Sequence, residues 1–328
     1  METFDIFGLD SPCMDLNANL DALPQRNGGA RLNDLSWQGG GKVSSGMVAA
    51  ARLGVRCALG GVLGDDIFGR FCYQDFQRHN INVDNMKVRT GCNTGLSVVI
   101  SEKDTQTRTI LFRMGQTKPL TEAEVDWSYL ERARYLFIAD TSALTRKAVA
   151  IARERGIKVF IDADSYTEGL RSMIPQIDYF VGSEFVFDKL FPNSRGKALD
   201  ELEDECAQLM AMGPEAVVFT FGEKGCVGLD REGFFWLPAF QVEAQDTVGA
   251  GDVFHGAFLA ALLKGYSLKE CARYASGTSA IKCTRIGGRA GIPNEQVLEQ
   301  FLRTGIIDYT EIDQRVEYYR KGLDYVSG

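Results

Sequence analysis

The alternation of short apolar runs with longer amphipathic segments constrains the fold of this chain more than any other feature. The apolar runs have the length of buried strands and lie at residues 4–8, 57–62, 135–139, 158–162, 179–182 and 216–221. Apolar residues recur at helical spacing in residues 44–53, 67–79, 146–155, 199–212, 253–264 and 268–281. This alternation predicts an α/β fold with a doubly wound, mostly parallel sheet flanked by helices.

Two further stretches are predicted to be β-hairpins and do not follow this alternation of strands and helices. Residues 15–23 and 31–37 alternate in polarity around a turn at 27–29, and residues 95–101 and 108–114 do so around residues 102–107. Such strands need not join the central sheet. We therefore expect a second, smaller β-structure.

Composition and charge exclude several classes of function. The net charge is −8 and no long cluster of Lys and Arg is present, which argues against binding to nucleic acid or to anionic membranes. No apolar run is long enough to span a bilayer and the first residues lack a signal-peptide pattern, so we expect a cytoplasmic protein. The eight cysteines form no Cys-x-x-Cys pair, and His79 and His255 are the two histidines, so zinc and Ser-His-Asp sites are not indicated. His255 could face a substrate or pack inside a helix bundle.

The segment at residues 246–254 has the composition of a phosphoryl-transfer site. Gly249 and Gly251 would let backbone N–H groups approach an anion at the start of a helix. Asp252 would lie among these donors, where a carboxylate can accept a proton from an attacking hydroxyl. The alternative is that Asp252 only caps the helix.

Together with Gly256 and the alanine-rich helix after it, this segment resembles the C-terminal signature of the ribokinase-like (PfkB) carbohydrate kinases. The resemblance implies a kinase domain at 1–305 with a C-terminal extension at 306–328, and ATP and Mg²⁺ as cofactors. It also implies that Asp252 is the catalytic base. The anion hole would be formed by Gly249, Ala250 and Gly251. The nucleotide would lie beside Asp246 and Thr247, with a monovalent cation such as K⁺ near Asp246 and Val248.

Residues 38–46 resemble the N-terminal signature of the same family. The resemblance implies substrate contacts from Gly40, Gly41, Lys42 and Ser45, although the family often has Asn where this chain has Ser45. Asp15 stands nine residues before Pro24, the family spacing for an Asp that binds sugar hydroxyls. Arg108 and Arg113 would either bind an anionic group of the acceptor substrate or be hairpin residues with no role in binding.

The segments expected to bind the nucleotide and its metal match the family pattern less completely. A Thr-x-Gly-x-x-Gly element is present as Thr220, Gly222 and Gly225, and in the family it lies along the phosphates. The family's Asn-x-x-Glu, which organises magnesium, falls where this chain has Ser183 and Val186, so Glu184 is the candidate metal residue. Residues 282–291 resemble the loop around adenine and the cation. There Arg285 and Arg289 would contact the ligand or be solvated.

The same resemblance implies that the two hairpins, within about 15–38 and 92–116, form a lid that closes over the sugar and mediates a homodimer. Residues 311–325 have helical character, and we expect them to pack peripherally. The predicted function is an ATP-dependent kinase that phosphorylates a hydroxymethyl group of a small sugar such as ribose or a ketohexose. The alternatives are a nucleoside kinase of the same fold and a catalytically silent sugar-binding sensor.

Overall fold

The structure is a computed structural model that describes residues 3–105 and 107–326. Within these residues a nine-stranded sheet runs in the order β13-β12-β11-β10-β9-β8-β1-β4-β5. All strands from β11 to β5 pair in parallel, and β12 and β13 extend the sheet as an antiparallel hairpin. The bounds are β1 Ile6–Asp10, β4 Cys57–Gly64, β5 Met86–Arg89, β8 Tyr135–Ile138, β9 Lys158–Ala163, β10 Tyr179–Ser183, β11 Ala216–Thr220, β12 Cys226–Asp230 and β13 Gly233–Leu237.

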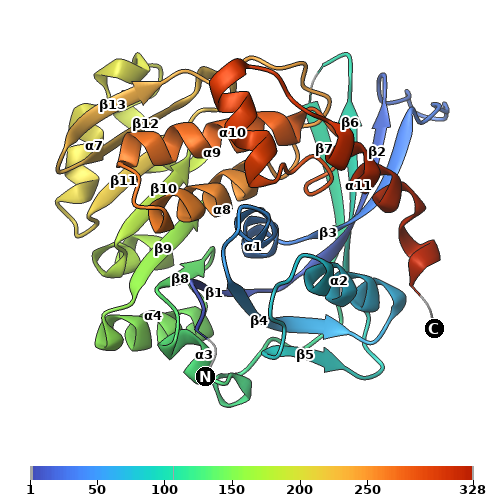
Figure 1. Ribbon diagram of the computed structural model, residues 1–328, viewed down its shortest axis with the longest axis horizontal. Coiled ribbons are helices and arrows are strands. Elements are labelled where there is room, and N and C mark those ends of the chain that lie inside the picture. The colour runs from blue at the N-terminus through green and yellow to red at the C-terminus, as the bar shows by residue number, and fades with distance from the viewer. Residues whose placement is uncertain (1–2, 106, 327–328) are drawn as a thin grey trace.

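Helices cover both faces of this sheet (Figure 1). One buried apolar cluster packs α1, α2, α8, α9 and α10 on one face, and a second packs α4, α5, α6 and α7 on the other. The bounds are α1 Lys42–Arg52, α2 Ile67–Arg78, α3 Ser128–Glu131, α4 Ala143–Arg155, α5 Glu168–Met173, α6 Glu184–Leu190, α7 Glu203–Met210, α8 Ala250–Leu263, α9 Leu268–Cys283, α10 Glu295–Thr304 and α11 Thr310–Lys321. The predicted doubly wound α/β fold is confirmed.

The six predicted strands are all present, but the edges of the sheet were missed. Strand β5 has four residues, β12 is interrupted by Gly228, and β13 is a short run of four apolar residues that was not recognised as a strand. The predicted helix at 199–212 is a 3₁₀ turn at Leu199–Glu201 followed by α7. These errors lie away from the central strands.

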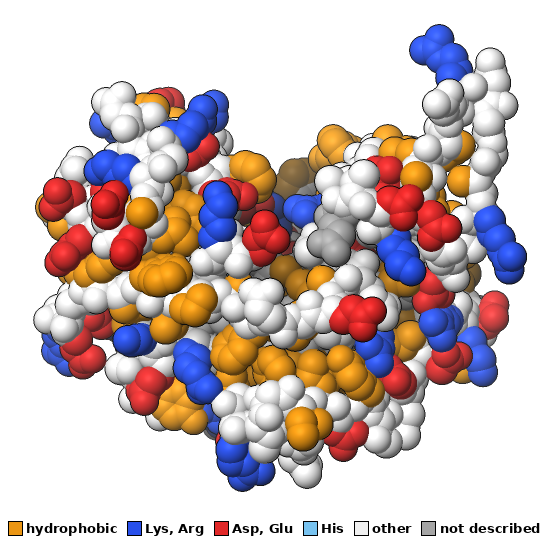
Figure 2. Space-filling view, turned by 90° about the horizontal axis from the view of Figure 1, so that it is seen from above, with side chains coloured by type: hydrophobic (Ala, Val, Ile, Leu, Met, Phe, Trp, Pro, Cys, Tyr) orange, Lys and Arg blue, Asp and Glu red, His pale blue; other side chains and the backbone are white. Residues whose placement is uncertain are grey.

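The two predicted hairpins form one separate four-stranded sheet in the order β3-β2-β6-β7, which we call the lid sheet. Its strands are β2 Cys13–Leu20, β3 Asp34–Gly40, β6 Gly95–Glu102 and β7 Thr107–Arg113. Residue 106, inside the second predicted turn, lies outside the described residues. Two residues separate β1 from β2, so the lid sheet begins directly at the carboxyl end of a central strand. Figure 2 shows the surface hollowed between the lid sheet and the body.

The C-terminal helix α11 is part of the packed structure, which contradicts the expected peripheral packing. Ile312 and Tyr319 are fully buried, and α11 lies against β3. Apolar residues at helical spacing in a charged segment were enough to bury one face. None of the helices described by the structure combines the length and apolarity needed to cross a membrane.

Candidate active site

The helices α1 and α8 bring their N-termini to the carboxyl edge of the parallel sheet. They cross in close contact, because a Cβ on Gly256 would overlap the carbonyl oxygen of Gly46. A Cβ on Gly46 would in turn lie 3.0 Å from the carbonyl oxygen of Asp252. Each helix start carries unpaired N–H groups and a partial positive charge, so this edge favours an anion.

The turn before α8 contains the three residues expected to form an anion hole, and in it the Ala250 N–H donates to the Thr247 carbonyl oxygen at 3.2 Å. Gly249 is the N-cap of α8 in a left-handed conformation, with φ of 70°. A Cβ on Gly251 would meet nothing within 4 Å, so the space over the first helical turn is open. Asp252 is half-buried in that first turn. The alternative that Asp252 is only the helix cap is wrong, because Gly249 occupies the cap position.

Acidic side chains gather around one ammonium group beside this turn. Lys42 at the start of α1 forms an ion pair with Asp164, and this bond raises the pKa of Lys42 although burial opposes it. Burial, followed by the charges of Asp162 and Asp164, raises the pKa of Asp252 well above its ordinary value. The carboxyl group of Asp10, at the end of β1, adds to this repulsion and accepts a hydrogen bond of 2.7 Å from the Ser44 N–H.

The hydrogen-bonding capacity of the Asp162 carboxyl group is not fully used. Its Oδ1 is buried and has no hydrogen-bond partner among the described residues. Burial and the neighbouring Asp164 raise the pKa of Asp162 to about 8. Its Oδ2 lies 3.3 Å from Nδ1 of His255, whose Nε2 lies 3.2 Å from the Val181 carbonyl oxygen. His255 is therefore a packed helix histidine, and burial lowers its pKa to about 4.

The lid sheet contributes Asp15. Its carboxyl group is half-buried on β2, and a Cβ on Gly40 would overlap that carboxyl group. Burial raises the pKa of Asp15, while hydrogen bonds from Cys13 and Ser97 oppose the rise. A Cβ on Gly41 would lie 2.6 Å from Asp10 Oδ2. The Gly40 and Gly41 loop therefore lies against Asp15 of the lid sheet on one side and against Asp10 of the central sheet on the other.

Two predicted substrate residues point elsewhere. The Ser45 hydroxyl is buried and lies 3.5 Å from Nε of Arg289. Arg113 is exposed and pairs across the lid sheet with Leu96, which pairs with Met14, so strand alternation directs it to the face opposite Asp15. Arg108 does reach the turn, because its Nη1 donates to the Thr247 hydroxyl at 3.4 Å.

The predicted nucleotide and metal residues lie along the same edge. Thr220 ends β11 beside the Gly182 carbonyl, at 3.4 Å, and Gly222 and Gly225 follow with φ of 55° and 100°. Glu184 begins α6 directly after the end of β10. No group of three His, Cys, Asp or Glu side chains within residues 3–105 and 107–326 forms a preassembled metal cage.

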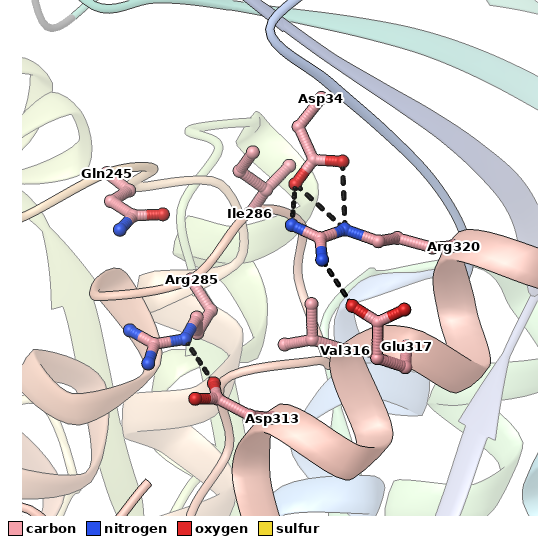
Figure 3. Close-up of a pocket in the computed structure, with 8 residues that line it drawn as sticks. All are labelled: Asp34, Gln245, Arg285, Ile286, Asp313, Val316, Glu317 and Arg320. Atoms are coloured by element: carbon pink, nitrogen blue, oxygen red, sulfur yellow. Dashed lines mark hydrogen bonds and ion pairs between the residues drawn. The ribbon is translucent and has the colours of Figure 1, made fainter.

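The sequence did not predict the contacts of Arg285 and Arg289. Arg285 forms a 2.7 Å ion pair with Asp313 of α11 and lines a cavity of about 280 Å³ between α11 and the loop at Gln245 (Figure 3). Arg289 is fully buried and forms a 2.7 Å ion pair with Asp75 of α2. Both alternatives for Arg289, solvation and ligand contact, are wrong. A partner 214 positions away leaves no local signal in the sequence.

Comparisons with known proteins agree with this geometry. The chain is 28% identical over 278 residues to a ribokinase of Haemophilus influenzae, covering 80% of this chain and 87% of that protein. It is 27% identical over 279 residues to fructokinase-2 of Zea mays, covering 77% and 82%, and 24% identical over 296 residues to a nucleoside kinase of Methanothermobacter thermautotrophicus, covering 89% and 94%.

Solved structures share the fold. A ribokinase of Arabidopsis thaliana, complexed with ribose and ATP, superposes with a TM-score of 0.78 at 18% identity over 92% of this chain and 99% of that one. A candidate ribokinase II from E. coli, in complex with ATP and Mg²⁺, gives 0.77 at 20% identity over the same shares. Residues 3–295 match the pfkB family carbohydrate kinase, and the chain therefore belongs to that family.

Proposed function

We propose that this protein transfers the γ-phosphoryl group of ATP to a hydroxymethyl group of a small sugar such as ribose or a ketohexose. The observation that carries the proposal is Asp252, held in the first turn of α8 beside an open space over Gly251. In this proposal the sugar lies between Asp15 and the Gly40 and Gly41 loop. The proposed nucleotide contacts are Thr220, Gly222, Gly225, Asp246 and Thr247.

Asp252 would accept the proton of the attacking hydroxyl. Its surroundings favour the protonated form, so the carboxylate is a stronger base than an exposed Asp. The N–H groups of Gly249 and Gly251 would stabilise charge on the transferred group, and the Ala250 N–H would join them by giving up its hydrogen bond to the Thr247 carbonyl oxygen. The ammonium of Lys42, which pairs with Asp164 beside this turn, supplies a fixed positive charge.

A divalent cation is part of this proposal. Asp252 interacts electrostatically with Asp10, Asp162, Asp164 and Lys42, and Asp162 keeps a buried oxygen without a partner among the described residues. Carboxylate oxygens are ligands that Mg²⁺ prefers. We propose that Mg²⁺ arrives with the nucleotide and is held by its phosphates and by Glu184, since the described residues form no three-carboxylate site of their own. Once bound, the metal would neutralise charge on the phosphates.

A homodimer through the lid sheet remains a proposal. The face of the lid sheet opposite Asp15 carries Leu35 and Leu111, which are 38% and 57% exposed. Leu35 lies on β3 and Leu111 on β7, so an association surface here would span the full width of the lid sheet. Sedimentation velocity of the full chain measures the dimer directly. A cytoplasmic location and the boundary of the kinase domain near residue 305 stay predictions.

Asp252→Asn tests the catalytic proposal. The parent protein and the variant are assayed for ADP release with ribose, fructose, sugar phosphates and adenosine. Loss of a general base lowers kcat by about 10²- to 10⁴-fold, whereas ATP binding measured by calorimetry persists. Asp200→Asn, at an exposed carboxylate in a 3₁₀ turn, is the matched control with unchanged turnover.

Each other result of this assay identifies one alternative. Equal turnover in Asp252→Asn and the parent would reject the role of Asp252. Turnover confined to adenosine would identify a nucleoside kinase. Sugar binding without ADP release from any acceptor would identify a silent sensor.

A further inference from the structure

A lysine ammonium lies directly behind the turn that leads into α8. Lys282, in the last turn of α9, is fully buried. Its Nζ donates to the carbonyl oxygen of Asp246 at 2.9 Å and to the carbonyl oxygen of Val248. Within residues 3–105 and 107–326, Lys282 pairs with no carboxylate. The charge is therefore held by main-chain carbonyl groups.

This arrangement is unusual for a lysine. Lysine is almost never fully buried unless it is paired, because removing an ammonium from water costs several kcal/mol. Carbonyl oxygens that converge on a buried positive charge are the ligands that proteins use for potassium ions. An ammonium group and K⁺ are similar in size, so Lys282 Nζ occupies a place suited to a monovalent cation.

The carbonyl groups bound by Lys282 belong to the turn that forms the proposed anion hole. The Asp246 carboxylate accepts hydrogen bonds from the N–H groups of Val248 at 2.9 Å and Gly287 at 2.8 Å. Lys282 fixes the carbonyl groups of the same turn. No cis peptide bond occurs in the described residues, so the N–H of Gly249 points away from the Val248 carbonyl and from Lys282. The ammonium thereby sets the direction of an anion-hole N–H.

We propose that Lys282 is a built-in monovalent cation that positions the 246–251 turn, so that this protein needs no potassium ion there. The inference rests on the proposed function, since the positioned turn is the proposed anion hole. It also replaces the expectation of K⁺ near Asp246 and Val248, because Lys282 already binds both carbonyl groups. Lys282 acts through the turn and is a positioning residue.

The test removes the ammonium and asks whether a free cation replaces it. Lys282→Ala leaves a space at the carbonyl groups, and Lys282→Met fills that space with an apolar chain. Phosphorylation is measured in potassium, ammonium or tetramethylammonium chloride at equal ionic strength. We expect parent turnover to be the same in all three salts. In tetramethylammonium we expect both variants to lose about 10²-fold, the loss typical of a misplaced catalytic group.

Rescue separates positioning from a purely structural role. K⁺ and NH₄⁺ should restore Lys282→Ala in a saturable manner but should not restore Lys282→Met. Lys269→Ala removes an exposed lysine from the same helix and is the matched control, with no cation dependence. Parent activity that requires K⁺ would overturn the proposal. Full activity of folded Lys282→Met in tetramethylammonium would also overturn it.

A second readout does not depend on catalysis. The melting temperature of Lys282→Ala should rise with KCl more than with tetramethylammonium chloride, whereas that of the parent should respond equally to both. If no acceptor is phosphorylated by the parent, the proposed function fails, and this selective stabilisation still tests the cation site. Equal responses in both proteins would reject the site. If Lys282→Ala does not fold, the activity of Lys282→Met decides.

Discussion

Two polar clusters flank the glycine loop at residues 39–45, and they differ in how completely their groups are satisfied. The acidic cluster consists of the Lys42–Asp164 ion pair and the neighbouring carboxyl groups of Asp10, Asp162 and Asp252. The arginine cluster joins Arg289 to Asp75, Tyr319 and His79. The first keeps a buried oxygen without a partner in the described part of the chain, and no orphaned atom is found in the second.

Hydrogen bonds link all four residues of the arginine cluster to one another. Arg289 donates to Asp75 at 2.7 Å and to the Gly40 carbonyl at 3.0 Å. Tyr319 donates to the other Asp75 oxygen at 2.7 Å, and His79 lies 3.1 Å from the Tyr319 hydroxyl. A satisfied network fixes its elements, whereas the acidic cluster keeps a buried Asp162 oxygen that no described group satisfies. The arginine cluster therefore positions the glycine loop, whereas the acidic cluster contains a polar atom that a ligand could satisfy.

The largest expected effect on stability comes from breaking the arginine cluster. Arg289→Met leaves the buried Asp75 carboxylate without its cation, which costs about 3–5 kcal/mol of unfolding free energy. Urea denaturation measures the loss. Arg285→Met removes an arginine four positions earlier whose partner Asp313 is exposed, and it should cost about 0–1 kcal/mol. Equal losses in the two variants would show that the cluster is not structural.

A pair of glycine substitutions sharpens the contrast between a packed and an open position on α8. Gly256→Ala places a Cβ on the Gly46 carbonyl and should cost about 1–3 kcal/mol by overpacking. In Gly251→Ala the new Cβ meets nothing within 4 Å beyond its own helix, and Ala suits a helix better than Gly, so the unfolding free energy should not fall while turnover does. Denaturation and ADP-release assays on both variants check this. A stable Gly256→Ala or a fully active Gly251→Ala would contradict it.

The smallest expected effect is a pH dependence from the acidic cluster. The pKa of Asp162 is about 8 in the folded chain, whereas its ordinary value is 3.8. The titratable groups around it are Asp164, Lys42, Asp10 and His255, which is neutral. The folded state binds this proton more tightly than the unfolded state, so stability falls as pH rises from about 4 to about 8. Asp162→Asn removes this penalty.

Melting temperatures without nucleotide test the sign of that effect. The advantage of Asp162→Asn over the parent should be greater at pH 8 than at pH 5, because the cost of ionising the buried Asp162 grows over this range. The exposed Asp200→Asn should show the same difference from the parent at both values. An advantage for Asp162→Asn that is larger at pH 5 would reverse the assigned direction of the Asp162 pKa.

Local patterns in the sequence determined the central sheet, the lid hairpins and the turn at Gly249. Apolar periodicity and glycine are signals carried by neighbouring residues, so they survive without any knowledge of distant contacts. The same patterns indicated Asp252 at the start of a helix, where the structure has it. Short edge strands such as β5 carry too few residues for such a signal.

Tertiary structure alone decided what the buried cations bind. Arg289 was predicted to be solvated or to contact a ligand, but its partner Asp75 lies 214 positions away. Lys282 meets the Val248 carbonyl 34 positions earlier because α9 packs beside the turn that leads into α8. A lysine or arginine looks the same in sequence whether its charge meets water or a carbonyl group. Only the packing of distant helices removes the water and selects the partner.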